Sequence, residues 1–170
     1  MLKENGEQLL NNFADTAYPP TVAKITSGIY HVMGYGHSNS IIIEAKNSVI
    51  LIDTLDTDVR AENLKKIVAG ITTKPIKTII YTHGHPDHRG GAGAFSDTNP
   101  EIIAFAPKKP VLGRTNELND ILNKRTTYQF GYNLSDDQVI TQGIGLERDL
   151  LLEKENMPLS QLLLFIRKKK

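Results

Sequence analysis

The sequence predicts a layered α/β fold in which helices pack on a mostly buried, mixed β-sheet. Between residues 22 and 130, short apolar segments of strand length alternate with helical periodicities in the order β-β-β-β-α-β-α-β-α. The chain has 170 residues, which suggests one domain with one sizeable core. It has no cysteine, so neither disulfide bonds nor thiolate metal sites contribute to the fold.

The charge balance and the hydropathy exclude several functional classes. Twenty Lys and Arg residues face nineteen Asp and Glu residues, so no overall field favours nucleic acid or an anionic membrane as a partner. Residues 1–12 lack the apolar stretch of a signal peptide, and no later run approaches the ~20 residues of a membrane span. As written, the chain is therefore expected to be a soluble cytoplasmic protein. If an upstream leader has been lost from this sequence, a periplasmic or secreted protein is expected instead.

The first part of the chain is predicted to be an arm followed by a β-meander. Residues 1–22 are polar, end in Tyr18-Pro19-Pro20 and are expected to run over the surface. Four strand-like segments follow: Val22–Ile25, Ile29–Met33, Ser40–Glu44 and Ser48–Ile52. Lys46-Asn47 is the expected tight turn between the last two, because Asn tolerates left-handed backbone angles. Since residues 49–52 are all apolar, we expect this strand to be covered on both faces.

Helical patterns and two further strands complete the expected elements. A helix with Asp56 or Thr57 as its N-cap and Gly70 just past its end would place its apolar residues on one face. These residues are Val59, Leu64, Ile67, Val68 and Ile71. The next segments are a strand at 76–81, a short helix at 91–95, a strand at 101–105 and a loosely helical stretch at 112–130.

Potential metal ligands are concentrated at residues 82–88, Thr-His-Gly-His-Pro-Asp-His, directly after the strand at 76–81. His83 and His85 are two residues apart, so in an extended segment their imidazoles project to the same side and could hold one cation between them. Pro86 ends the extended segment, so Asp87 and His88 point in another direction and could serve a second cation. Imidazole and carboxylate ligands together suit Zn²⁺ or another borderline divalent metal.

The alternative interpretation of this loop is a polar surface segment that happens to be rich in histidine. The chain has five histidines, and three of them lie here in an alternating pattern, which favours the metal site. His31 alternates with apolar neighbours in a predicted strand and is expected to be a half-exposed sheet residue. His37 lies in a glycine-rich loop that could line a pocket, and its role stays open.

Two more side chains are candidates for holding the ligands in place. Asp53 ends the predicted strand at 48–52. Its carboxylate could cap a helix or form a turn, or it could accept the second N–H of a ligand histidine and so fix that ring in one tautomer. Thr82 could act in the same way through its hydroxyl group.

The pattern His-x-His-x-Asp-His after a strand resembles the metal motif of the metallo-β-lactamase superfamily. The resemblance implies an αββα sandwich, of which this chain would be the first half, and a site for two zinc ions. It also implies that His83 and His85 bind the first ion and that Asp87 and His88 bind the second, with Asp87 as the catalytic residue. Asp53 matches the superfamily's first motif, an Asp after a hydrophobic strand.

A second stretch resembles the alkylsulfatases of this superfamily. Residues 123–131, Asn-Lys-Arg-Thr-Thr-Tyr-Gln-Phe-Gly, and residues 142–145, Gln-Gly-Ile-Gly, are similar to the region that follows the metal motif in those enzymes, and residues 103–107 are similar to their intervening strand. The resemblance would make Arg125 and Tyr128 binders of an anionic ester head group, since the guanidinium fork suits a pair of sulfate or phosphate oxygens. The alternative is that Arg125 is a solvated helix charge and Tyr128 a core aromatic.

The chain departs from the family pattern after residues 82–88, which we call the metal loop. Superfamily members need a further His and acidic ligands from the later half of the fold, yet no histidine follows His88. We therefore expect three parts: an N-terminal arm at 1–22, the N-terminal half of a metallo-β-lactamase-like domain at 23–150, and a divergent or truncated tail at 151–170.

The expected function is the metal-dependent hydrolysis of sulfate esters by a metal-activated water, with zinc as the cofactor and a small-molecule ester as the substrate. Because downstream ligands are missing, the chain could be inactive by itself, form a homodimer, or associate with the missing half. The alternatives are another hydrolase of the superfamily, such as a lactonase or a thioesterase, or a non-catalytic fragment that binds metal. Neither a nucleic-acid partner nor a membrane span is expected.

Overall fold

The computed structural model describes residues 5–105, 116–131, 133–135, 138–141, 144–145 and 167–168. Several sequence predictions lie outside these residues: the helix start at 112–115, positions 106–107 and 142–143 of the alkylsulfatase-like segments, and all but two residues of the tail at 151–170. Among the helices of the described part, none combines the length and the apolar character needed to cross a bilayer.

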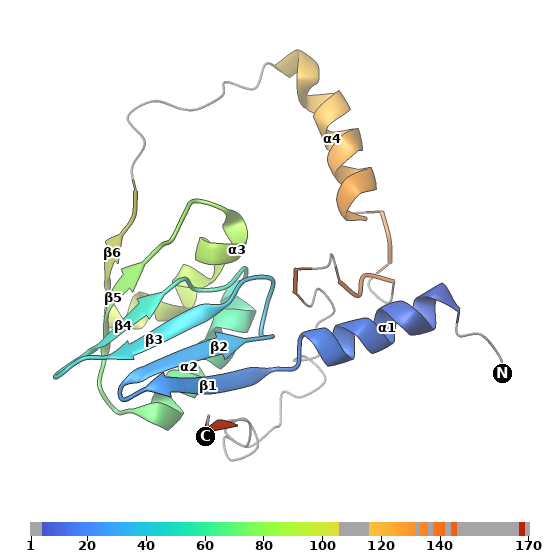
Figure 1. Cartoon of the computed structure of the whole chain (residues 1–170). Helices are drawn as coiled ribbons and strands as arrows, with labels where there is room; N and C mark the ends of the chain where they lie inside the picture. The colour runs from blue at the N-terminus through green and yellow to red at the C-terminus, as the bar shows by residue number, and fades with distance from the viewer. Residues whose placement is uncertain are drawn as a thin grey trace.

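The described strands form one mixed sheet of seven, in the order β6-β5-β4-β3-β2-β1-β7 (Figure 1). The strands are β1 (Thr21–Thr26), β2 (Ile29–Met33), β3 (Ser40–Glu44), β4 (Val49–Ile52), β5 (Ile76–Ile80), β6 (Glu101–Ile103) and β7 (Arg167–Lys168). The first four pair antiparallel, which confirms the predicted meander. β4, β5 and β6 run parallel to one another, and β7 runs parallel to β1. This mixed α/β architecture confirms the predicted fold class.

Local sequence explains how neighbouring strands are connected. The Ala45 N–H donates to the Ser48 carbonyl at 2.9 Å, so Lys46-Asn47 forms the predicted tight turn between β3 and β4. β4 and β5 are parallel and therefore need a crossover, which is the helix α2 (Asp58–Ile71). Its N-cap is Thr57, whose side chain accepts from the Arg60 N–H, as predicted.

The structure corrects the end and the orientation of α2. The helix includes Gly70 and ends at Ile71 with Thr72 as its C-cap, so the predicted end is two residues too early. Val59, predicted on the apolar face, is 53% exposed, whereas Arg60 and Ala61 are buried. At 100° per residue, Val59 lies about 140° around the helix from Leu64, which is fully buried, and so it faces away from the sheet.

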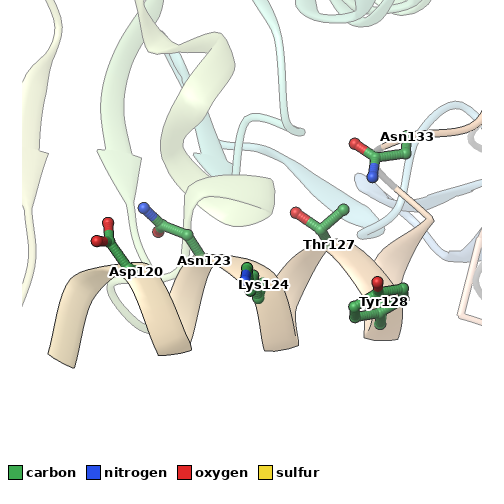
Figure 2. A pocket seen from close by; sticks show the side chains of 6 residues that line it. All are labelled: Asp120, Asn123, Lys124, Thr127, Tyr128 and Asn133. Carbon is green, nitrogen blue, oxygen red and sulfur yellow. The ribbon is translucent and has the colours of Figure 1, made fainter.

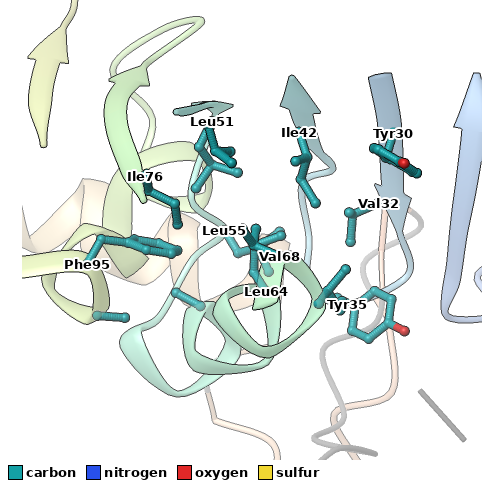
Figure 3. Packing of buried hydrophobic residues seen from close by; sticks show 14 of the residues in the cluster. Tyr30, Val32, Tyr35, Ile42, Leu51, Leu55, Leu64, Val68, Ile76 and Phe95 are labelled. Atoms are coloured by element: carbon teal, nitrogen blue, oxygen red, sulfur yellow. The ribbon is translucent and has the colours of Figure 1, made fainter. Parts of the chain in front are cut away.

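The core lies between one face of the sheet and the helices α2 and η1 (Figure 3). Ile42, Leu51 and Ile79 lie opposite one another on β3, β4 and β5 and are fully buried. Leu64 of α2 and Phe95 of η1 (Gly90–Thr98) are fully buried against this row. The core therefore holds the carboxyl ends of β4 and β5 side by side.

The opposite face of the sheet is also apolar but only half-buried. Val49 and Leu51 are fully buried, whereas Ile50 and Ile52, which point to the other side of β4, are partly exposed. Ile41 and Ile43 of β3 pair with Ile52 and Ile50 and share that partial exposure. We predicted that β4 would be covered on both faces. The described residues cover one face fully and the other only in part.

The helices outside the core differ from the predictions in two places. Residues 1–22, expected to be an arm, contain the helix α1 (Gly6–Ala17), whose capping box joins Asn5 and Gln8. Ala14 of α1 packs with Ile140 in a small second cluster. The short helix expected at 91–95 is longer: α3 (Pro86–Arg89) leads directly into η1, a 3₁₀ helix. The last helix, α4 (Asn116–Phe130), lies within the helical stretch predicted at 112–130.

Candidate metal centre

The metal loop leaves the carboxyl end of β5 beside the residue that ends β4. Because the two strands are parallel, Asp53 follows β4 at the same edge of the sheet at which Thr82 follows β5. The Asp53 N–H donates to the Ile80 carbonyl at 2.9 Å, which extends the strand pairing by one bond. The chain then turns at Pro86, the first residue of α3, as the proline predicts.

Asp53 is the centre of a hydrogen-bond network at this edge. Its Oδ1 accepts from the Thr82 N–H at 2.8 Å, and its Oδ2 accepts from the Thr82 hydroxyl at 2.7 Å. The same Oδ2 lies 2.8 Å from Nδ1 of His88. Asp53 is 4% exposed and is not the cap of α2, which is Thr57. A buried carboxylate on Nδ1 holds the imidazole with Nε2 turned away from it, which is the arrangement that a ligand histidine needs.

The three imidazole rings of the loop gather beside this network. The ring centroids of His83 and His85 are 4.6 Å apart, and those of His83 and His88 are 4.0 Å apart. Nε2 of His88 lies 3.3 Å from Oδ2 of Asp87. His88 therefore packs against His83, and the two ligand pairs are not separated as the turn at Pro86 led us to expect. The one-turn helix α3 brings His88 back toward the end of β5, where Asp53 holds it.

The donor set fits a borderline divalent metal, although the side chains are not closed around one point. Three imidazoles and a carboxylate are the ligands that zinc prefers in the absence of thiolates. Within the part of the chain that the structure describes, no group of three or more His, Asp or Glu side chains is arranged to hold a metal ion. His83 and His85 are exposed, with Nδ1 of His83 3.1 Å from the Thr82 hydroxyl, whereas His88 is half-buried and contacts Asp53 through Nδ1.

Two tyrosines near this edge of the sheet stay neutral at physiological pH. Burial raises the pKa of Tyr81, and the negative charge of Asp53 adds to that rise against the opposing effect of Arg89. Burial raises the pKa of Tyr35, in the loop after β2, to about 12. Neither phenol is therefore a base at neutral pH.

The two histidines outside the motif have other partners. His31 is a half-buried residue of β2 opposite Ile41, as predicted. Nδ1 of His37 lies 3.7 Å from Oδ2 of Asp56, and that same oxygen accepts from Arg60 at 2.8 Å. His37 thus lies beside the ion pair of Asp56 and Arg60 at the start of α2.

Arg125 and Tyr128 lie on α4, apart from the metal loop in sequence and structure. Both are exposed, Tyr128 to 86%, so Tyr128 is not a core aromatic. Tyr128 lines a cavity of about 470 Å³ along α4 with Asp120, Asn123, Lys124, Thr127 and Asn133 (Figure 2). Arg125 does not line it, and no interaction that the structure shows among its described residues joins either side chain to residues 82–88.

Sequence patterns did not identify the groups that hold the backbone of the loop. The hydroxyl of Ser38 donates to the Asp87 carbonyl, Thr54 N–H donates to the His88 carbonyl, and Arg89 Nε donates to the Gly84 carbonyl. The first two bonds join residues 49 and 34 positions apart, so no local spacing reveals them. In the Gly34–Asn39 loop, the sequence points only to His37 and not to Ser38.

The family model of the metallo-beta-lactamase superfamily matches residues 33–159, and the chain belongs to this superfamily.

Within the superfamily, the chain is similar to alkylsulfatases. It is 38% identical over 120 residues to the alkyl/aryl-sulfatase BDS1 of Saccharomyces cerevisiae, and the aligned region covers 66% of this chain and 19% of that protein. It is 32% identical over 112 residues to a linear primary-alkylsulfatase of Pseudomonas sp., with an aligned region of 62% of this chain and 21% of that protein. The solved structure of the inverting sec-alkylsulfatase Pisa1 from Pseudomonas sp. superimposes with a TM-score of 0.51 at 26% identity, covering 66% of this chain and 19% of that one. The chain thus spans about a fifth of the length of these relatives.

Proposed function

We propose that this chain carries the metal-binding part of a zinc-dependent hydrolase that cleaves sulfate esters. The observation that carries the proposal is the buried carboxylate of Asp53 on Nδ1 of His88 at 2.8 Å, beside two further imidazoles at the end of β5. The similarity to alkylsulfatases over 120 residues supports the sulfate ester as the substrate class. The reaction would convert a small alkyl sulfate and water into an alcohol and sulfate.

In this proposal, each residue of the loop has a distinct task. His83 and His85 would hold one zinc ion, and Asp87 and His88 would hold a second. Bound zinc would lower the pKa of a water molecule toward neutrality. Asp53 would keep His88 in the tautomer whose Nε2 is a ligand, and Thr82 would hold Asp53 through its two hydrogen bonds. Asp87, whose Oδ2 lies beside Nε2 of His88, would accept a hydrogen bond from the attacking water and so orient it.

We assign the sulfate head group to α4. The guanidinium of Arg125 offers a planar set of donors that matches two sulfate oxygens, and Tyr128 lies one helical turn away with its hydroxyl group at a cavity. Both side chains are exposed and so are accessible to a ligand. The head group would have to be brought together with residues 82–88 when the substrate binds.

The half-buried face of the sheet supports an association with a further protein layer. Ile41, Ile43, Ile50 and Ile52 form an apolar row on β3 and β4 that the described residues cover only in part. An apolar sheet face of this kind is stable when another layer packs on it. A second copy of this chain, or a segment that supplies further metal ligands, is the partner that we propose for this face.

The activity can be tested with zinc-loaded protein and three substrates: decyl sulfate below its micelle concentration, a lactone and a thioester. We expect inorganic sulfate to appear with decyl sulfate and no turnover of the other two. If only the lactone or the thioester is hydrolysed, the substrate is not a sulfate ester but belongs to another substrate class of the superfamily. If fewer than two zinc ions bind tightly per chain and no substrate is turned over, the chain is a non-catalytic metal-binding fragment.

Replacing Asp53 by alanine is expected to weaken zinc binding by about 10- to 100-fold, because His88 loses the partner that fixes its ring. Competition with a chelator of known zinc affinity measures the change. Asp97→Ala is the matched control, since Asp97 pairs with Lys65 at 2.9 Å on an exposed part of η1. Equal zinc affinities for the two variants would contradict the role given to Asp53.

A further inference from the structure

Two buried serines lie between the loop after β2 and the strand β3, and both donate to the backbone of proposed site residues. Ser38 is 5% exposed and its hydroxyl donates to the Asp87 carbonyl at 2.5 Å. Ser40 is fully buried and its hydroxyl lies 2.8 Å from the Asp53 carbonyl and 3.0 Å from the Ile52 carbonyl. One short segment of chain therefore contacts both the metal loop and the residue that orients His88.

The geometry of α3 explains why the Asp87 carbonyl needs an outside donor. The helix is only four residues long, so its last carbonyls have no amide one turn further along the helix. The Gly91 N–H, which would reach the Asp87 carbonyl in a longer α-helix, donates instead to Leu55 at 3.1 Å. The next carbonyl, that of His88, accepts from the Thr54 N–H at 2.8 Å. Ser38 and Thr54 thus hold the backbone of the two neighbouring ligands from outside the helix.

The backbone of Asp53 needs a similar support. Its φ is 60°, in the left-handed region that residues other than glycine rarely adopt. Such a conformation persists when the surrounding structure holds it in place. Ser40 contacts the carbonyl of Asp53 while the carboxylate of the same residue binds Thr82 and His88. The position of that carboxylate therefore depends on Ser40 as well as on β4.

We propose that Ser38 and Ser40 are positioning residues that set the distance between Asp87, His88 and Asp53 before a metal ion binds. The inference rests on the proposed function, because it takes Asp87 and His88 as metal ligands. The two hydroxyl groups are two residues apart in one segment that continues into the central strand β3. A shift of this segment would move the ligand backbone and the orienting carboxylate relative to each other.

The test uses the full chain with Ser38→Ala, Ser38→Gly and Ser40→Ala. Alanine and glycine at position 38 both remove the hydroxyl group but differ in volume, so comparing them separates the loss of the hydrogen bond from the loss of volume. Thr98→Val is the matched control, because the Thr98 hydroxyl makes the same kind of bond, 3.0 Å to the Phe95 carbonyl, away from the metal loop. Zinc affinity is measured by chelator competition, and Co²⁺ is added as a spectroscopic probe of ligand geometry.

We expect the three serine variants to bind zinc about tenfold more weakly than the wild type and to shift the Co²⁺ absorption bands, with Thr98→Val unchanged. In the metal-free protein, the ¹³C resonance of the Asp87 carbonyl should move in the Ser38 variants alone. Wild-type affinity and spectra in all three serine variants would overturn the positioning role and leave the proposed function intact. A wild-type chain that binds neither metal would refute the metal site, and the inference with it, whereas the carbonyl resonance would still report whether Ser38 holds Asp87.

Discussion

Replacing His85 by alanine is expected to abolish binding of the zinc ion assigned to His83 and His85. His85 is one of the two imidazoles assigned to the first ion, and its ring lies against that of His83 at 4.6 Å. It precedes α3 as the N-cap residue, but its side chain makes no capping hydrogen bond, and it is exposed. The substitution should therefore change the free energy of unfolding by less than about 0.5 kcal/mol while it removes a ligand. Zinc content after dialysis, measured by mass spectrometry of the metal, checks the prediction.

His31→Ala is the control for this experiment, because His31 is a histidine of β2 that lies outside the motif. It should retain the zinc content of the wild type. If His85→Ala also retained it, the loop at 82–88 would not be the metal site.

Replacing Gly91 by alanine is expected to lower the free energy of unfolding by about 3 kcal/mol or more. A Cβ atom at Gly91 would lie 2.3 Å from the Thr54 carbonyl oxygen and 2.5 Å from the Cβ of Ala61. The first of these neighbours is backbone and the second belongs to the buried face of α2, so neither can move aside easily. Because Thr54 also binds the His88 carbonyl, the clash would disturb the metal loop as well as the core. Denaturant unfolding of the metal-free protein measures the loss.

Gly84→Ala offers a matched control within the metal loop itself. A Cβ atom at Gly84 would have nothing within 4 Å, so this variant should keep the wild-type stability within about 0.5 kcal/mol. Similar unfolding curves for the two alanine variants would show that η1 does not pack against the loop at 54–57 as closely as the structure indicates.

The features that the sequence predicts well are those with a local physical signal. The short apolar runs of β2 and β3, the turn at Lys46-Asn47 and the Thr57 cap each depend on neighbours a few residues away. The contact between Asp53 and Thr82 follows from one further rule, since residues that end adjacent parallel strands meet at one edge of the sheet.

The features that the sequence analysis missed have two different causes. The helix α1 carried a readable signal, because Asn5 and Gln8 have the spacing of a capping box, but the polar composition of residues 1–22 outweighed it. Ser38 and Ser40 carried none, since hydroxyl groups that reach carbonyls 49 and 13 residues away leave no periodicity in the chain. The contact between the rings of His88 and His83 likewise depends on how far α3 turns after Pro86, which the sequence does not specify.

The parallel pairing of β4 with β5 also makes this site depend on a contact between residues that are distant in the sequence. Asp53 and His88 are 35 residues apart, and they meet only after α2 has closed the crossover between the two strands. Contacts of such separation are costly in chain entropy and form late in folding. An ion that recognises only the finished arrangement would therefore prolong the lifetime of the native state without accelerating its formation.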